Sequence, residues 1–412
     1  MNQAPISSAD ASAGKAGNAT TQKIYVARAL RDFGDGFSAV LLPVYLTTIG
    51  MGPFEIGLFA TLALLGSALT TLLVGWFGAK IDQRLLLIAA AVLMTATGIA
   101  FATSTAIGLI LLIAFVGTIN PSAGTVSIFV PLEHTLLSHA VPDSQRTSMF
   151  ARYSLIGSLA AAVGALAAAG PQYLTAFGVE PLAALKAMFV VYAVLGVLGG
   201  VVYAQLPRAQ NQRPDLPPAM LGPSRAIVYK LAALFSVDSF AGGFAVQSLI
   251  ALWLFNKFGL SLAAAGLFFF WSGVLSAFSF PVAAWLSARI GLVNTMVYTH
   301  IPASLCLILA AVVPNLTVAL ALLLIRSALS QMDVPARSSY VMAVVTPPER
   351  PAAASVTSVP RSLASAFSPA IAGAMFAAGH NAWPLVICGV LKIVYDLALL
   401  WAFQHVKPPE EV

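Results

Sequence analysis

The feature that most constrains this chain is a series of long apolar runs without charge. Examples are "LLLIAAAVLMTATGIAFATS" from Leu85, "FVVYAVLGVLGGVVYA" from Phe189 and "LTVALALLLI" from Leu316. A helix needs about 20 mostly apolar residues to cross the hydrocarbon core of a bilayer. Of the 412 residues, 59% are hydrophobic and only 9% are charged. A typical soluble domain has about 25% charged residues, so most of the surface is expected to face lipid.

The apolar runs predict twelve membrane-spanning segments. Backbone polar groups inside lipid must be bonded within the protein, and the alternation expected of barrel strands is absent, so the spans are predicted to be helices. The predicted spans begin near Phe33, Glu55, Leu85, Ile107, Phe150, Leu182, Ile227, Leu262, Leu292, Leu316, Ala352 and Trp383.

The distribution of lysine and arginine predicts the orientation. If the N-terminus is cytoplasmic, most basic residues lie at cytoplasmic helix ends and loops, whereas Lys186 and Lys257 lie on the outer side. We therefore expect a multi-pass protein of the inner (cytoplasmic) membrane with both termini in the cytoplasm. The net charge of +6 follows from this topology. The basic residues are scattered and lack interleaved aromatics, so no nucleic-acid partner is expected.

One sequence frame occurs twice. "VPLEHTLLSHAVPDSQR" begins at Val130 and "VPARSSYVMAVVTPPER" begins at Val334, 204 residues later. Both copies open with Val-Pro and close on an arginine, Arg146 or Arg350, and each lies at the cytoplasmic end of a predicted span, the fourth or the tenth. A repeat of half the chain predicts two similar six-helix bundles, with a substrate site between them near the middle of the bilayer.

The domain organisation follows from this repeat. The first residues are small and polar without an apolar segment, which predicts a disordered tail and not a signal peptide. A stretch rich in proline and charge separates spans six and seven. The expected parts are a cytoplasmic tail (1–23), an N-terminal six-helix bundle (24–206), a cytoplasmic linker (207–226), a C-terminal six-helix bundle (227–406) and a cytoplasmic tail (407–412).

Short motifs add a family resemblance. The loop "GAKIDQR" from Gly78 and its weaker counterpart "AWLSARIGL" from Ala284 are similar to the signature loop of the major facilitator superfamily, and "GSLAAAVGALAAAGP" from Gly157 is loosely similar to a fifth-helix motif of its exporters. The resemblance implies an all-α integral membrane protein with twelve transmembrane helices in two pseudo-symmetric six-helix bundles. It also implies secondary transport by alternating access, with a structural or gating role for Asp82.

Ionisable residues inside the spans are the main functional candidates, because each costs about 2.5–3.5 kcal/mol unless it is paired or hydrated. Asp35 on span one and Asp238 at the equivalent place on span seven are candidate proton sites, because burial in a low dielectric favours a protonated carboxyl. A purely structural role is the alternative for both. Lys392 and Asp396 are spaced i,i+4 on the last span and are expected to neutralise each other.

A second group is expected to line the substrate cavity. Arg326, Asp333 and Arg337 are spaced by seven and four residues, which places them on one face of span ten. An unpaired Arg326 suits a substrate carboxylate or phosphate. The alternative is a buried ion pair with an acid from another helix. The other cavity candidates are Asn120, which interrupts span four, and the arginines Arg152 and Arg361.

The charge difference between the two Val-Pro frames predicts a gate. Glu133 in the first copy corresponds to Arg337 in the second, so Glu133 is predicted to pair with Arg337 or Arg361 in the outward-facing state. The alternative is that Glu133 binds Arg152 or His134 within its own bundle. The further gating candidates are Asp82 and Arg146.

These observations favour a transporter over an enzyme. The sequence has no Gly-Lys-Ser phosphate loop and no His, Cys or Glu spacing typical of a metal site, so no catalytic residue, metal or cofactor is expected. We expect a monomeric secondary transporter in the lipid bilayer that moves a small organic solute, through proton-coupled efflux as an antiporter. The alternatives are an organic-anion symporter or uniporter that uses the cavity arginines and, outside transport, a sensor. The coupling ion is a proton or another ion.

Overall fold

The computed structural model describes residues 8–77, 81–122, 127–140, 143–208 and 221–406. The regular structure of these residues is helical. The α-helices are α1 (Ser8–Thr48), α2 (Pro53–Phe77), α3 (Gln83–Thr103), α4 (Ile107–Val116), α5 (Phe129–Ala140), α6 (Asp143–Ala167), α7 (Gly170–Ala176), α8 (Pro181–Ala204), α9 (Arg225–Gly243), α10 (Gln247–Phe258), α11 (Leu262–Ile290), α12 (Leu292–Val312), α13 (Leu316–Leu329), α14 (Asp333–Ala343), α15 (Arg350–Ala377) and α16 (Trp383–Phe403), and the 3₁₀ helix η2 is Pro347–Glu349.

The order of the helices follows the predicted spans. Eight spans correspond to single helices, and the other four correspond to the consecutive pairs α4/α5, α6/α7, α9/α10 and α13/α14. Within the described residues, nine segments are long and apolar enough to cross a membrane. The remaining predicted spans are α1 and α15, which carry more polar residues, and the interrupted pair α4/α5.

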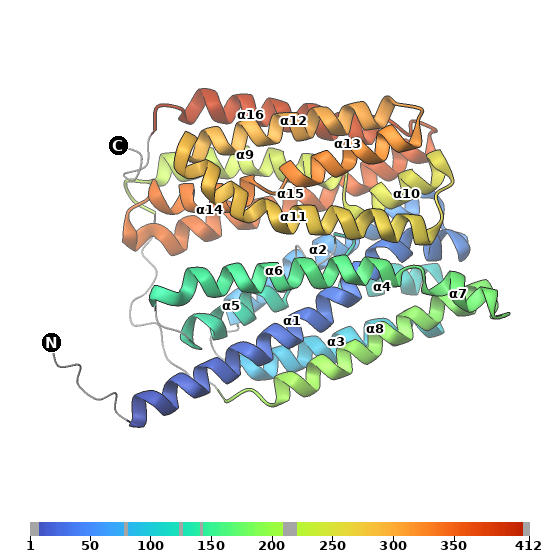
Figure 1. Ribbon diagram of the computed structural model, residues 1–412, viewed down its shortest axis with the longest axis horizontal. Helices are drawn as coiled ribbons and strands as arrows, with labels where there is room; N and C mark the ends of the chain where they lie inside the picture. The colour runs from blue at the N-terminus through green and yellow to red at the C-terminus, as the bar shows by residue number, and fades with distance from the viewer. Residues whose placement is uncertain (1–7, 78–80, 123–126, 141–142, 209–220, 407–412) are drawn as a thin grey trace.

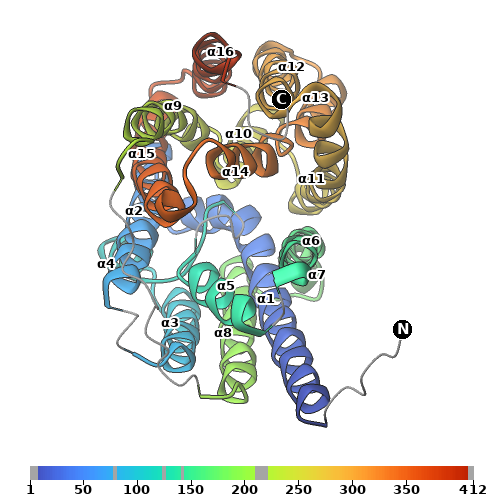
Figure 2. The same cartoon turned by 90° about the vertical axis from the view of Figure 1, so that its left-hand side faces the viewer.

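The helices form two groups. Figure 2 shows α9–α16 together in its upper half and α1–α8 in its lower half, and we call these groups the C-terminal and N-terminal bundles. The start of α1 and the end of α16 lie on the left of Figure 1, and we call this side the terminal end of the molecule; the opposite side is the far end. The domain boundaries at 24–206 and 227–406 remain a prediction, and most of the linker and the last tail (209–220 and 407–412) lie outside the described residues.

The repeated Val-Pro frame marks the same structural event in both bundles. Pro131 is the third residue of α5 and Pro335 is the third residue of α14, and each helix resumes a span that has been interrupted just before it. Proline has no backbone N–H, so it suits the first turn of a helix but cannot continue an unbroken ladder. The frame therefore positions the second half of spans four and ten.

The N-terminal tail differs from its prediction. Helix α1 begins at Ser8, so residues 8–23, which the sequence predicts to be disordered, are helical. Alanine is frequent in this stretch and has the highest helix propensity, and adding residues to an existing helix avoids the cost of nucleation. Lys23 also anchors this part of the helix, since its Nζ donates to the carbonyl of Gln205 at 2.8 Å.

The bundles meet closely where α2 packs against α15. Gly57 and Gly373 face each other, and a Cβ at either glycine would clash with the backbone of the other helix. Next to them, the backbone N–H of Ala370 donates to the hydroxyl of Thr61 at 3.0 Å. All four residues belong to the half of the molecule near the far end, because α2 starts and α15 finishes there.

A second contact, between α6 and α11, has the same location. A Cβ on Gly266 would meet the carbonyl of Ala165, and a Cβ on Gly273 would meet the side chain of Ala162. Three hydrogen bonds join the described parts of the two bundles in the far half, namely Ala370 to Thr61, Ala263 to Gln172 and Ser248 to Pro121. The structure is therefore closed at the far end.

Candidate functional site

A buried charge cluster lies inside the N-terminal bundle. Arg28 pairs with Asp32 at 2.6 Å, one turn along α1, and Arg31 lies 3.4 Å from the other oxygen of Asp32. Arg31 Nη1 also reaches Glu133 of α5 at 3.0 Å. Glu133 is fully buried and additionally accepts from the hydroxyls of Tyr153 and Tyr203. The charges of this cluster therefore compensate one another within one bundle.

The glycine-rich stretch of α6 makes room for this cluster. Gly157 faces the Arg28–Asp32 pair so closely that a Cβ would overlap both side chains. Farther along, Gly164 packs against the carbonyl of Phe33, which brings α6 against the backbone of α1. The fifth-span motif thus has a direct structural role, because it allows charged side chains of α1 to be buried beside α6.

Asp35 lies one turn deeper on α1 and has different surroundings. Its side chain is buried, with 1% of the residue exposed, and its Oδ1 accepts from the hydroxyl of Tyr192 at 3.3 Å. Within the described residues, no lysine, arginine or histidine lies within ion-pair distance of Asp35. It is a buried carboxyl without a cationic partner.

Asp238 of α9, the predicted counterpart of Asp35, is held by cations. Lys392 donates to its Oδ1 at 2.6 Å, and Arg337 donates to its Oδ2 at 3.0 Å. The same Arg337 nitrogen lies 3.1 Å from Asp333, one turn away on α14. The sequence predicts these two carboxyls to be equivalent, but among the described residues Asp35 has no cationic partner, whereas Asp238 accepts hydrogen bonds from two.

The expected neutralisation of Lys392 by Asp396 is wrong. Lys392 binds Asp238, whereas both oxygens of Asp396 lie near His300 Nδ1, at 3.0 and 3.1 Å. His300 Nε2 in turn lies 3.3 Å from Lys392 Nζ. Lysine and aspartate at i,i+4 can meet, but here each side chain has a better-placed partner on a neighbouring helix.

The predicted stripe on span ten is divided between two helices. Arg326 belongs to α13 and Asp333 begins α14, with a three-residue turn between them, so the three residues do not share one helix face. The physical reason is Pro335, which lacks the N–H that a continuous ladder would need. Arg326 itself is partly buried, and within the described residues it has neither an ion pair nor a hydrogen bond to another side chain.

The other cavity candidates are placed separately. Arg361 of α15 is partly buried and donates from Nε to the hydroxyl of Ser239 at 2.8 Å. Arg152 is exposed on α6. Asn120 is buried in the interruption between α4 and α5, where its Oδ1 accepts from the N–H of Ser122 at 2.8 Å. Asn120 therefore shapes a turn.

The gating candidates are apart in this conformation. Glu133 is bound to Arg31 and two tyrosines, and Arg337 is bound to two aspartates, so neither contacts the other here. Asp82 caps α3 by accepting from the N–H of Arg84 at 2.9 Å. The side chain of Arg146 lies outside the described residues.

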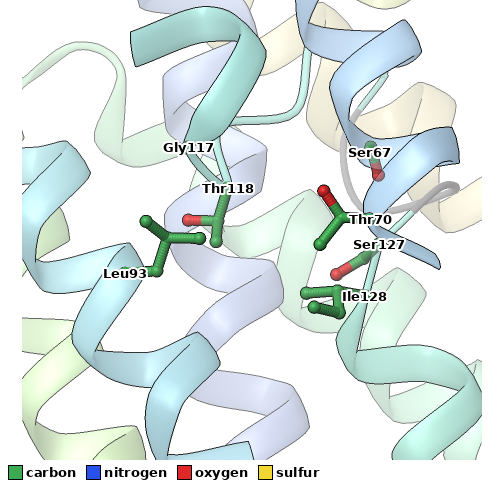
Figure 3. Close-up of a pocket in the computed structure, with 7 residues that line it drawn as sticks. All are labelled: Ser67, Thr70, Leu93, Gly117, Thr118, Ser127 and Ile128. Carbon is green, nitrogen blue, oxygen red and sulfur yellow. The ribbon is translucent and has the colours of Figure 1, made fainter. Parts of the chain in front are cut away.

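Two of the cavities among the described residues bear on the site. A small one, about 10 Å³, is lined by Ser67, Thr70, Leu93, Gly117, Thr118, Ser127 and Ile128. Figure 3 shows Ser67 and Thr70 of α2 on one side of it and Leu93 and Thr118 on the other. The larger cavity, about 320 Å³, lies where α9, α14 and α15 meet, and Arg337 and Arg361 both line it.

Several residues of these clusters were not identified as candidates from the sequence. His300, Tyr153 and Tyr203 complete the charge clusters, and all are buried. His300 is a titratable residue in a predicted span, and that alone is a signal of function that could have been used. No comparable signal marks the tyrosines, because aromatic residues are common in membrane helices. No group of three or more metal-type ligands occurs among the described residues.

Known proteins resemble this chain along most of its length. A curated relative, the uncharacterized membrane protein YJR124C of Saccharomyces cerevisiae, is 23% identical over 414 residues and covers 92% of each chain. Solved structures with a similar fold include the nucleoside transporter NupG (13% identity, TM-score 0.72, 94% of this chain and 99% of that one). An inward-facing, unoccupied bacterial homolog of the human lysosomal transporter Spinster has 15% identity and a TM-score of 0.68, with 93% and 95% of the two chains covered.

A third structure is the human organic anion transporter MFSD10, with 16% identity, a TM-score of 0.63 and 93% and 99% of the two chains covered. At these identities the structures establish the fold. The family model described as Major Facilitator Superfamily matches residues 24–325 and 232–412. Two helical bundles that meet through α2/α15 and α6/α11, together with this match, place the chain in the Major Facilitator Superfamily of secondary transporters.

Proposed function

We propose that this protein moves a small organic solute across the membrane in exchange for protons, and that Asp35 binds the coupled proton. The observation that carries the proposal is the burial of Asp35 without a cation. A lone carboxylate in such surroundings is costly, so the site favours the protonated form until water or another charge reaches it.

The charge balance of the N-terminal cluster supports this role. Arg28 and Arg31 provide two positive charges, and their partners Asp32 and Glu133 provide two negative charges. Ionisation of Asp35 would leave the buried cluster with an excess negative charge. Binding of one proton at Asp35 removes this excess. Loss of that proton is therefore favourable only when the surroundings of the cluster change.

A polar path leads away from Asp35. The hydroxyl of Tyr192 lies 3.3 Å from the Asp35 carboxyl and 3.3 Å from the hydroxyl of Thr118. Thr118 lines the small cavity seen in Figure 3, whose volume of about 10 Å³ approaches that needed for one water molecule. Water at this position would connect the carboxyl to solvent through hydroxyl groups.

The exchange requires two conformations. The closed far end corresponds to the inward-facing state if both termini are cytoplasmic, as the basic residues predict. In the outward-facing state, Glu133 pairs with Arg337 or Arg361 across the terminal end, after leaving Arg31. An accessibility assay on single-cysteine variants tests this gate: unchanged populations of the two states in Glu133→Gln would exclude it.

A second candidate function is transport of organic anions by symport or uniport. The observation that favours it is Arg326, a partly buried guanidinium without an acid partner in the described chain. Such a group suits a carboxylate or phosphate. The fold similarity to the organic anion transporter MFSD10 is compatible with this candidate.

Flux into proteoliposomes tests the proposed function. Vesicles with a pH gradient and an internal pH dye are exposed to a panel of organic cations, anions and neutral solutes. We expect at least one solute to dissipate the gradient faster in protein-containing vesicles than in empty ones. A solute flux that does not depend on the pH gradient would contradict proton coupling. No flux of any solute would favour a sensor.

A further inference from the structure

The larger cavity has a chemistry that differs from the Asp35 region. It measures about 320 Å³, within the range of small-molecule sites, and lies in the terminal half of the C-terminal bundle. Its charged lining residues are Arg337 and Arg361, and no acid from the described part of the chain lines it. Its remaining wall includes hydroxyl-bearing residues, namely Ser338, Ser355, Thr357 and Ser358, and apolar residues such as Phe235.

Arg361 is held in place but not neutralised. Its Nε donates to Ser239 at 2.8 Å, which fixes one edge of the guanidinium. Within the described chain, no carboxylate lies within ion-pair distance of Arg361, and its two terminal nitrogens have no hydrogen-bond partner in the protein. A guanidinium fixed at Nε presents its remaining N–H groups in a geometry that fits two oxygens of one anion.

Arg337 supplies a second positive charge that cannot move freely. Its Nη1 is shared between Asp238 and Asp333, and its guanidinium lies over the ring of Phe235, 5.5 Å from the ring centroid. Lys392 also binds Asp238. Because these acids are already engaged by cations, they do not provide a site for a cationic ligand, and the cavity favours an anion.

The uncharged residues of the cavity indicate the shape of the rest of the ligand, beyond its charged group. Phe235 and Met342 offer an apolar surface beside the two arginines. Within the described residues, the hydroxyl of Ser358 makes a single long hydrogen bond of 3.4 Å, to Ser355 in its own helix, so it can reorient toward a ligand oxygen. An anion with an apolar body would therefore satisfy both parts of the cavity.

We propose that this cavity binds a small organic anion, with its carboxylate or phosphate on Arg361 and its apolar body against Phe235 and Met342. The proposal rests on the proposed transport function for its physiological role, because it then names the substrate class. Binding itself is independent of Asp35. A proton-coupled mechanism and an anionic substrate can therefore fail separately.

The test is a ligand-stabilisation screen on the purified full-length protein, read as melting temperature. One arm contains aliphatic and aromatic monocarboxylates, a second contains phosphate monoesters with similar apolar groups, and a third contains the matching neutral amides. We expect concentration-dependent stabilisation in the first or second arm but not in the third, and the responding arm identifies the head group.

Variants then locate the site. Arg361→Gln is expected to weaken binding of the responding anion at least tenfold, and Arg361→Lys is expected to retain part of the affinity. Arg289→Gln is the matched control, because Arg289 stacks on Trp285 at the end of α11. Equal stabilisation by the amides, or unchanged affinity in both Arg361 variants, would overturn the proposal. If no anion binds, this proposal fails, and the flux assay separately tests proton-coupled transport of other solutes.

Discussion

Asp35 of α1 and Asp238 of α9, which the sequence predicts to be counterparts, are both buried but have different electrostatic surroundings. The carboxyl of Asp35 accepts from Tyr192, whereas that of Asp238 receives Lys392 and Arg337. Duplicated halves would be expected to begin with similar sites. Here one copy provides a carboxyl that can bind a proton, and the other provides a fixed anion that orients two cations.

This difference predicts unequal effects of the same substitution on thermal stability. Asp238→Asn leaves Lys392 and Arg337 without their shared counter-charge, and breaking a buried ion pair typically costs about 3–5 kcal/mol. We expect a clear loss of thermal stability in detergent. Asp35→Asn strands no cation and should melt close to the wild type. Equal losses in the two variants would contradict the contrast between the sites.

The close packing of α6 on α1 predicts a strong effect at Gly157. A methyl group at this position would overlap Arg28 and Asp32, and overpacking of this kind costs about 1–3 kcal/mol. Gly157→Ala should therefore lower the melting temperature. Gly199→Ala is the control, because a Cβ there meets nothing within 4 Å. The account of the fifth-span motif fails if both variants melt like the wild type.

The loop between α14 and α15 predicts a pH dependence outside the membrane. Hydrogen bonds from Ser224, Thr346 and the N–H of Gly222 lower the pKa of Glu349 to about 2. An ordinary glutamate has a pKa of about 4.3. A lowered pKa in the folded state means that Glu349 stabilises the fold fully above the ordinary value, and that this contribution is lost as the pH falls toward 2.

Melting curves between pH 6 and pH 3, as a rough working range set by these two pKa values, check this prediction. The difference in melting temperature between the wild type and Glu349→Gln should be constant near the upper end of this pH range and should shrink toward its lower end. Glu55→Gln, at the first turn of α2, is the control for general acid effects. A difference that does not change with pH would contradict the assignment.

The sequence predicted the fold because its signals are local. Apolar runs predict spans, and the repeated Val-Pro frame predicts two similar bundles. Asp35 and Asp238 stood out for an equally local reason, because an ionisable side chain in an apolar run is costly wherever it points.

The partners of these residues could not be predicted, because they depend on helix rotation and on contacts between distant segments. Asp238 and Lys392 are 154 positions apart, and His300 and Asp396 are 96 positions apart. In helices that are apolar on every side, periodicity does not identify the inward face. This is why Lys392 and Asp396 looked like each other's partners in the sequence while each contacts another helix.

The central claim is that Asp35 carries the coupled proton, and a comparison of two transport modes tests it most directly. Reconstituted wild type and Asp35→Asn are assayed for exchange of labelled solute at equal pH on both sides and for net movement driven by a pH gradient. Asp35→Asn should keep the exchange and lose the response to the gradient. If the variant still moves solute against its concentration gradient when only a pH difference is imposed, Asp35 is not the coupling site.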